Sequence, residues 1–318
     1  MLTANMYESN YTRVAEVWIT GLQNSETARI PLFIFLLTIY LTVLMGNSLV
    51  ILLVLSRSHL QSPMYIFLSG LSFSEIIFTS DLMPTLLGAL LQGGTAIYFI
   101  SCLAQFYLCA SLGVTECLLL AVMSFDRYMA ICDPLHYQLV MSSQLCLLLI
   151  IFSWAGGFMI VLIALIMICQ LDFCGPRVVD HFFCDFAPLL ELSCSNSSAV
   201  KTYISLCVVA AIIFPLAFVM GTYVCIIHVI FRIPSSAGRK KAFSTCSSHL
   251  SVVYTYYGTL IILYVIPHHA VSSTSNKILS LMYTVVTPLF NPIIYSLRNQ
   301  EIKEVLKHLL PGISKSKK

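Results

Sequence analysis

Seven apolar stretches dominate the chain, and each is long enough to cross the hydrocarbon core of a bilayer as a helix, which takes about 20 residues. They lie near residues 30–55, 64–90, 97–131, 144–169, 199–231, 242–266 and 278–297. The stretches are too long to be strands of a membrane barrel, and a helix pairs its own backbone amides within lipid. Only 10% of the 318 residues are charged, against about 25% in soluble domains. The sequence therefore predicts an all-α membrane protein, a seven-transmembrane helix bundle.

The distribution of Lys and Arg predicts the orientation of this bundle. If the N-terminus lies outside, twelve of these residues fall on the inner side and five on the outer side, which is the bias that orients helical membrane proteins. Residues 1–29 are then extracellular and residues 298–318 cytoplasmic. In that tail, EIKEVLKHLL has the alternation of a short amphipathic helix on the membrane surface. The net charge of +3 suits anionic lipid and an acidic partner rather than nucleic acid.

Two outer segments match the acceptor pattern for N-linked glycosylation. They are Asn10-Tyr11-Thr12 in the N-terminal segment and Asn196-Ser197-Ser198 before the fifth stretch. We expect Asn10 to carry a glycan, whereas the pattern at Asn196 leaves the matter open.

Twelve cysteines divide between the helices and the outer loops. Eight lie within or beside predicted helices, where a small thiol serves packing. The other four, Cys102, Cys174, Cys184 and Cys194, lie on the oxidising side, and they allow three pairings into two disulfides. We favour Cys102–Cys184, which would tether the loop across the bundle mouth, and Cys174–Cys194, which would fold the loop on itself. His181 and Cys184 have the spacing of metal ligands, but a bridged cysteine offers no thiolate, so we predict no metal.

Five long motifs occur in order along the chain. They are PMYIFLSGLSFSE (63–75), MSFDRYMAICDPLHY (123–137), HFFCDFAPLLELSC (181–194), KAFSTCSSHL (241–250) and PLFNPIIYSLRN (288–299). Together they make the chain similar to the vertebrate odorant receptors, which are rhodopsin-like G-protein-coupled receptors. The resemblance implies a receptor in the plasma membrane of olfactory cilia, without a cofactor or enzymatic activity. It also implies that a small odorant binds in the bundle and that the stimulatory olfactory G protein raises cyclic AMP.

An acid and a base end the third predicted helix, in the sequence Asp126-Arg127-Tyr128. Arg127 alone would serve as a membrane anchor whose side chain reaches the interface. An adjacent carboxylate would weaken that role, whereas an acid that holds and then releases Arg makes a bistable element. The resemblance implies that Arg127 then meets the G protein, with Tyr223 and Tyr295 moving into contact nearby. In the seventh helix, Asn291-Pro292 has the composition of a hinge.

Two acids lie deep in the predicted bilayer. Glu116 stands eleven residues before Arg127, or roughly 16 Å along a helix, and Glu75 stands twelve residues after Pro63, or roughly 18 Å. Isolated carboxylates at this depth would be costly, so they are expected to be protonated or to share a cation. The resemblance implies a cation site formed with Asn47 and Asn291. The family usually has Asp where Glu75 stands.

Ligands of such bundles sit in the outer half, and helical spacing gives the side chains that would face inward there. These are Phe106, Cys109, Ala110, Gly113 and Val114 in the third helix, Ile204, Cys207, Val208 and Ala211 in the fifth, Tyr257, Leu260, Ile261 and Tyr264 in the sixth, and Leu281 and Thr284 in the seventh. The lining is apolar with a few hydroxyls, which favours a small, neutral, mostly hydrophobic molecule. Receptors for amines carry an Asp at the place of Cys109, and this chain does not.

The sequence argues against two other functions of a membrane helix bundle. A transporter or channel would need polar residues across the whole bilayer, whereas Glu75 and Glu116 end beneath an apolar outer half. An intramembrane enzyme would need a nucleophile and a base, or a set of metal ligands, at one depth. A receptor of the same fold that senses a non-volatile metabolite or lipid outside the olfactory system remains the main alternative. The role of Asp81 in the second helix is open.

Overall fold

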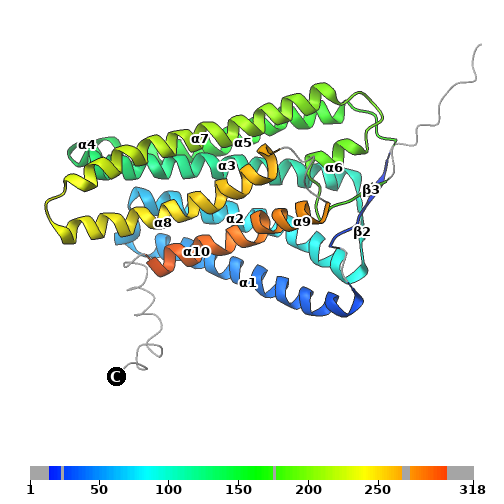
Figure 1. The fold of residues 1–318 in the computed structure, drawn as a ribbon, viewed down its shortest axis with the longest axis horizontal. Coiled ribbons are helices and arrows are strands. Elements are labelled where there is room, and N and C mark those ends of the chain that lie inside the picture. The colour runs from blue at the N-terminus through cyan, green and yellow to red at the C-terminus, as the bar shows by residue number, and fades with distance from the viewer. Residues whose placement is uncertain (1–13, 23–24, 175–176, 267–272, 299–318) are drawn as a thin grey trace, which may run out of the picture.

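Seven long helices form one bundle in the computed structural model, which describes residues 14–22, 25–174, 177–266 and 273–298 (Figure 1). The spans are α1 (Glu26–Ser56), α2 (Pro63–Gln92), α3 (Phe99–Cys132), α5 (Ser143–Cys169), α7 (Ser198–Arg232), α8 (Ser236–Leu260) with a π-helical turn (Ile261–Val265), and α9 (Ser273–Leu281), which a second π turn (Met282–Val286) joins to α10 (Thr287–Arg298). Between the spans lie α4 (Pro134–Val140), α6 (Phe186–Glu191) and a 3₁₀ turn (Ser58–Leu60). Asn10 and the amphipathic helix predicted beyond Arg298 lie outside the described residues.

The sixth span differs most from the stretch expected for it. It begins at Ser236 rather than near residue 242, because the Ser235 side chain accepts a hydrogen bond from the backbone N–H of Gly238 and so caps the helix. Among the described residues, α1, α2, α3, α5, α7 and the stretch 274–294 are long and apolar enough to cross a membrane, and α8 is not. The cause is the many Ser, Thr and Tyr residues of α8.

Several Ser and Thr hydroxyl groups of α8 are satisfied within the helix itself. Ser251, Thr255 and Thr259 each donate to the carbonyl four residues earlier, at 2.7 to 2.9 Å. Such bonds remove most of the cost of placing a hydroxyl in lipid or in a bundle interior. A polar composition therefore does not prevent α8 from being the sixth span.

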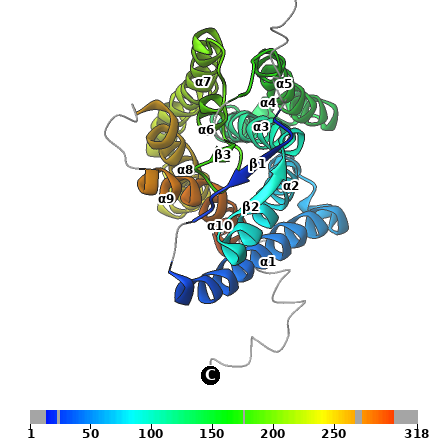
Figure 2. The same ribbon diagram turned by 90° about the vertical axis from the view of Figure 1, so that its right-hand side faces the viewer.

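The third helix lies at the centre of the bundle and contacts α2, α5, α7 and α8 (Figure 2). Its approach to α5 depends on Gly157, because a Cβ there would lie 2.6 Å from the carbonyl oxygen of Ser111. Large apolar side chains such as Phe35 on α1, Phe152 on α5 and Phe214 on α7 are exposed on the outside, as expected for helices that face lipid.

A small sheet covers the outer end of the bundle, which the sequence did not predict. Strand β1 (Glu16–Ile19) lies between β2 (Thr95–Tyr98) and β3 (Val178–Val179), antiparallel to the first and parallel to the second. Two disulfides lie at the same end. Cys102 pairs with Cys184, with Cα atoms 5.4 Å apart, and Cys174 pairs with Cys194, with Cα atoms 5.8 Å apart. These are the pairings favoured above, and they hold the loop before α7 against the top of α3.

Candidate functional site

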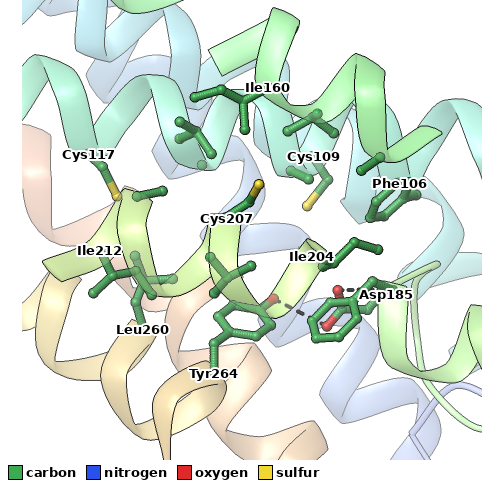
Figure 3. A pocket seen from close by; sticks show the side chains of 18 of the residues that line it. Phe106, Cys109, Cys117, Ile160, Asp185, Ile204, Cys207, Ile212, Leu260 and Tyr264 are labelled. Carbon is green, nitrogen blue, oxygen red and sulfur yellow. Dashed lines mark hydrogen bonds between the residues drawn. The ribbon is translucent and has the colours of Figure 1, made fainter. Parts of the chain in front are cut away.

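A cavity lies in the outer half of the bundle, and its walls come from α3, α5, α7, the sixth and seventh spans and the loop before α6 (Figure 3). Its lining consists of Phe106, Cys109, Ala110, Gly113, Val114, Cys117, Ile160, Val161, Ala164, Phe183, Cys184, Asp185, Phe186, Ile204, Cys207, Val208, Ala211, Ile212, Leu260, Tyr264 and Tyr283. The cavity offers about 100 Å³ to the centres of water-sized spheres, whereas one water needs about 10–15 Å³ on that measure. A small organic molecule with a mostly apolar surface fits this space.

Eleven of the fifteen residues expected from helical spacing line this cavity, and the other four do not. The exceptions are Tyr257, Ile261, Leu281 and Thr284. The Tyr257 hydroxyl instead donates to the carbonyl of Cys117 at 2.8 Å, between α8 and α3, and the Thr284 hydroxyl donates to the carbonyl of Ser280 at 2.8 Å in its own span.

Two of these exceptions lie within π turns, Ile261 in the sixth span and Thr284 in the seventh, whereas Tyr257 and Leu281 precede them. A π turn holds one more residue than an α-helical turn, so the faces that follow from 3.6 residues per turn shift within it. In the sixth span, Leu260 and Tyr264 line the cavity but Ile261 does not. In the seventh, Tyr283 lines it in place of Leu281 and Thr284. Each π turn thus presents one tyrosine to the cavity.

Asp185 supplies the only carboxylate among the cavity-lining residues. One carboxylate oxygen accepts from the backbone N–H of Phe186 at 2.8 Å, and the other accepts from the Tyr264 hydroxyl at 3.2 Å (Figure 3). Burial in the loop raises the pKa of Asp185 to about 6, although both hydrogen bonds oppose this rise. Spacing on the helices missed this residue. The sequence did give one indication of Asp185: it follows Cys184, and the disulfide from Cys184 to Cys102 holds this part of the loop over the third helix.

Two further parts of the lining were not expected from the sequence. The first is a side wall from α5, made by Ile160, Val161 and Ala164. The second is Tyr283, which lies at the inner end of the cavity close to Gly113. A Cβ at Gly113 would lie 2.7 Å from the Tyr283 hydroxyl, so glycine at this position leaves room for the hydroxyl where it now lies.

The two buried acids lie beneath the cavity, each with a different partner. The Asn291 side-chain amide donates to Glu75, and the Ser74 hydroxyl donates to Glu116 at 3.2 Å. The second oxygen of Glu75 and the amide oxygens of Asn47 and Asn291 are buried, with no hydrogen-bond partner among the described residues. The structure thus brings together the residues expected to form a cation or proton site, and their free oxygens could ligate a cation.

At the inner end, Asp126 holds two side chains at once. Its carboxylate accepts from Arg127 Nε at 2.9 Å and from the Tyr137 hydroxyl at 2.8 Å. Asp126 itself is fully buried. Tyr137 belongs to α4, and burial together with the nearby Asp126 raises the pKa of its hydroxyl, which therefore stays a hydrogen-bond donor. Tyr137 thus joins Asp126 and Arg127 as a third residue of this cluster and links α4 to α3. The adjacency of Asp126 and Arg127 in the sequence did not indicate it.

The remaining residues of the expected switch occupy different places. The Tyr223 hydroxyl lies 2.8 Å from Nδ1 of His249, and both side chains are buried, whereas Tyr128 is half-buried. Pro292 lies in α10, where a Cβ added at Gly46 of α1 would come within 3.0 Å of it. Tyr295 lies in α10 as well, but its side chain is outside the described part of the chain.

Comparison with known proteins decides the family. A family model described as "Olfactory receptor" matches residues 36–312. The chain belongs to the olfactory receptor family. Human olfactory receptor 11L1 is 45% identical over 305 residues, covering 96% of this chain and 95% of its own, and human olfactory receptor 10A4 is 45% identical over 306 residues, covering 96% and 97%. Squid rhodopsin shares the fold, with a TM-score of 0.74 at 17% identity, over 92% of this olfactory receptor and 84% of its own chain.

Membership of this family and the shared fold fix the general class of activity. This olfactory receptor is a seven-helix, G-protein-coupled receptor and not an enzyme, and it is a multi-pass protein of the plasma membrane. The fold class predicted from the seven apolar stretches is thereby confirmed. The assignment of individual side chains to ligand or G protein stays a prediction.

Proposed function

We propose that this receptor binds a small, mostly hydrophobic odorant in the cavity of the outer half and activates the stimulatory olfactory G protein, which raises cyclic AMP. We place it in the cilia of olfactory neurons, as the family resemblance implies. The observation that carries the proposal is the cavity itself, whose walls are mostly apolar. Asp185 and Tyr264 form one polar corner, and Tyr283 adds a second hydroxyl near Gly113. The ligand then has an apolar body and one hydrogen-bonding group, which refines the neutral hydrophobic molecule expected from the sequence.

Ligand binding acts through the spans that carry the two π-turn tyrosines. Only binding energy that differs between two conformations shifts their populations. A ligand that contacts Tyr264 and Tyr283 contacts both the sixth and the seventh spans, so it favours one arrangement of these spans relative to α3. That rearrangement has to reach Tyr223 and His249, whose hydrogen bond joins α7 to α8 near the inner end.

The resting inner end holds Arg127 against Asp126, and activation releases it toward the G protein. The helix α4 offers a second contact, because Leu135 and Leu139 are 87% and 79% exposed and lie one turn apart. Apolar side chains this exposed beside a charged switch suit an apolar pocket on a protein partner. The oxygens around Glu75 would hold a cation or a shared proton in the resting arrangement.

A screen of volatile compounds tests this function. The receptor is expressed with the stimulatory olfactory G protein, and cyclic AMP is read out after each compound. We expect a response that Arg127→Ala abolishes at equal surface expression. The matched control Arg57→Ala, which removes an exposed guanidinium between α1 and α2, should keep the response. A response that persists in Arg127→Ala would leave this residue as a membrane anchor, and silence despite surface display would favour a non-volatile metabolite or lipid.

A further inference from the structure

The N-terminal strand crosses the outer end of the bundle, where a ligand from outside would have to pass (Figure 2). Strand β1 is the middle strand of the outer sheet, so both of its edges are hydrogen-bonded. Its chain continues beyond Ile19, where the backbone N–H of Thr20 donates to Val179 at 3.1 Å and that of Gly21 donates to His181 at 3.0 Å. His181 lies two residues before Phe183, which lines the cavity. The strand is therefore attached to the loop that forms the cavity wall.

One buried lysine fastens this strand to the seventh span. The side chain of Lys277 on α9 is only 8% exposed, and a buried ammonium is costly unless its three donors find acceptors. Lys277 Nζ contacts Asp180 Oδ1 at 2.7 Å, the Thr20 hydroxyl at 3.2 Å and the Gly21 carbonyl at 3.1 Å. Two of these three acceptors come from the N-terminal segment.

The contact is reinforced within the outer segments. The Thr20 hydroxyl, which accepts from Lys277, also donates to Asp180 Oδ1 at 2.9 Å. Burial and the nearby Lys277 lower the pKa of His181 to about 3, so this ring adds no positive charge to the cluster at neutral pH. Further along, the Trp18 ring packs over Gly94, where an added Cβ would lie 2.5 Å from it.

We propose that the N-terminal strand is a lid over the ligand cavity, and that Lys277 is the latch that holds it closed. Opening separates Thr20 and Gly21 from Lys277 and frees β1 from the sheet, so that molecules outside reach the cavity. Closing restores two acceptors to a buried ammonium, which is why the closed state prevails. The lid sets how fast a molecule enters and leaves, and it does so whichever ligand the receptor binds.

Cavity thiols allow a test that needs no identified ligand. Cys207 lines the cavity and is not in a disulfide. The full-length receptor on intact cells is treated from outside with trimethylammonioethyl methanethiosulfonate, a cation that does not cross lipid. The receptor is then purified, and modification of each cysteine is followed by mass spectrometry. The exposed Cys169 at the outer end of α5 lies outside the cavity lining and serves as a reference in the same molecule.

Two variants of the latch should increase the rate at which the reagent modifies Cys207. Thr20→Val keeps the shape of the side chain but removes its hydroxyl, and Lys277→Met removes the ammonium. Because each loses hydrogen bonds to a charged group, we expect rates higher by about tenfold. Thr20→Val should add less in the Lys277→Met background than it does alone, since only the hydrogen bond from Thr20 to Asp180 then remains to be lost. Lys201→Met, which removes an exposed outer lysine, should leave the rate unchanged. Unchanged rates in both latch variants, or an equal increase at Cys169, would overturn the proposal.

A staple tests the lid without disturbing the buried charge. Glu16 of β1 and Tyr98 of β2 are direct partners in the antiparallel pair, and both are exposed. Partners in such a pair lie within the Cα separation that a disulfide spans. Oxidation of the Glu16→Cys/Tyr98→Cys receptor should slow modification of Cys207 about tenfold or more relative to either single variant, since β1 can no longer leave the sheet. An equal rate in the stapled receptor and the single variants would show that β1 is no lid.

Discussion

The inner and outer ends of this receptor are built from contacts of very different sequence range. At the inner end, Arg127 binds the adjacent Asp126, which also binds Tyr137 eleven residues away. At the outer end, Tyr264 binds Asp185 at a separation of 79 residues, and Lys277 binds Thr20 at a separation of 257. The Asp126 cluster of the inner end is thus local to one helix and its following loop, whereas the outer contacts come from the N-terminal segment, a loop and two distant helices.

The difference has a consequence for how each end responds to change. The carboxylate of the local charge pair, Asp126, is fully buried, so loss of the pair should act on signalling and stability together. The outer contacts are spread over several segments, and when one of them breaks, water can take the place of the lost partner. Changes there should act on binding and access while leaving the inner end intact.

The largest effect is expected from Asp126→Ala. It leaves Arg127 and the Tyr137 hydroxyl without their acceptor, and breaking a buried ion pair costs about 3–5 kcal/mol. We expect a lower melting temperature of the purified receptor and higher cyclic AMP without ligand, because Arg127 is no longer held. Both are measured at matched surface expression.

Asp133 provides the matched control for this variant. It stands at the start of α4 and pairs with His136, but both side chains are largely exposed. Such pairs contribute about 0–1 kcal/mol, so Asp133→Ala should change neither quantity noticeably. If Asp126→Ala and Asp133→Ala changed melting temperature and basal cyclic AMP equally, the buried pair would be no more important than an exposed one.

A smaller effect, confined to the outer end, is expected from Gly113→Ala. The added methyl group would meet the Tyr283 hydroxyl at 2.7 Å, and overpacking of this kind costs about 1–3 kcal/mol. Odorant potency should fall because Tyr283 is displaced, while basal cyclic AMP stays unchanged. Gly221→Ala on α7 is the control, since nothing lies within 4 Å of its added Cβ. A rise in basal signalling in Gly113→Ala would show that the two ends are not separable.

The same contrast explains how much the sequence could predict. Six of the seven spans follow from apolar length, α8 being the more polar exception, and the Asp126–Arg127 pair follows from adjacency, because both are local properties. The cavity faces of α3 and α7 also follow from regular helical spacing. In the seventh span the π turn shifts that spacing, so Tyr283 was missed and Thr284 was expected in its place. Regular helical spacing does not anticipate a π turn.

Residues that enter the site through tertiary contacts were beyond sequence analysis for a related reason. Asp185 and Lys277 appeared as ordinary outer-loop charges until the loop and the N-terminal strand were placed in space. The strand β1 has four residues, EVWI, too few for a reliable periodic signal. What makes it a strand is its pairing with β2 and β3, which are distant in the chain.

The pH dependence of stability tests the buried carboxyl of the outer end. The pKa of Asp185 is raised in the folded receptor from 3.8 to about 6, so its stabilising contribution is complete below pH 4 and is lost as the pH rises through 6. We expect the stability of the receptor relative to Asp185→Asn to fall by about 1–2 kcal/mol between pH 4.5 and 7.5. The pKa of His181 is lowered from 6.5 to about 3 in the folded receptor, so this ring also makes stability depend on pH in this range. Both proteins contain it, so its contribution cancels from the difference between them. A difference in melting temperature that is constant with pH would contradict the assignment.

The smallest effect is expected from Tyr264→Phe, which removes one hydroxyl from the polar corner of the cavity. The lost hydrogen bond to Asp185 is 3.2 Å long, and a bond of ordinary strength corresponds to about a fivefold change in affinity. Odorants with a hydroxyl or carbonyl group should lose potency by about this factor, whereas hydrocarbons of similar size should not. Tyr107→Phe is the matched control, because its hydroxyl donates to Phe158 at 3.3 Å between α3 and α5 and Tyr107 is not among the lining residues. Equal losses for polar and apolar odorants would mean that the corner shapes the cavity without recognising the ligand, since only a hydrogen bond distinguishes the two groups.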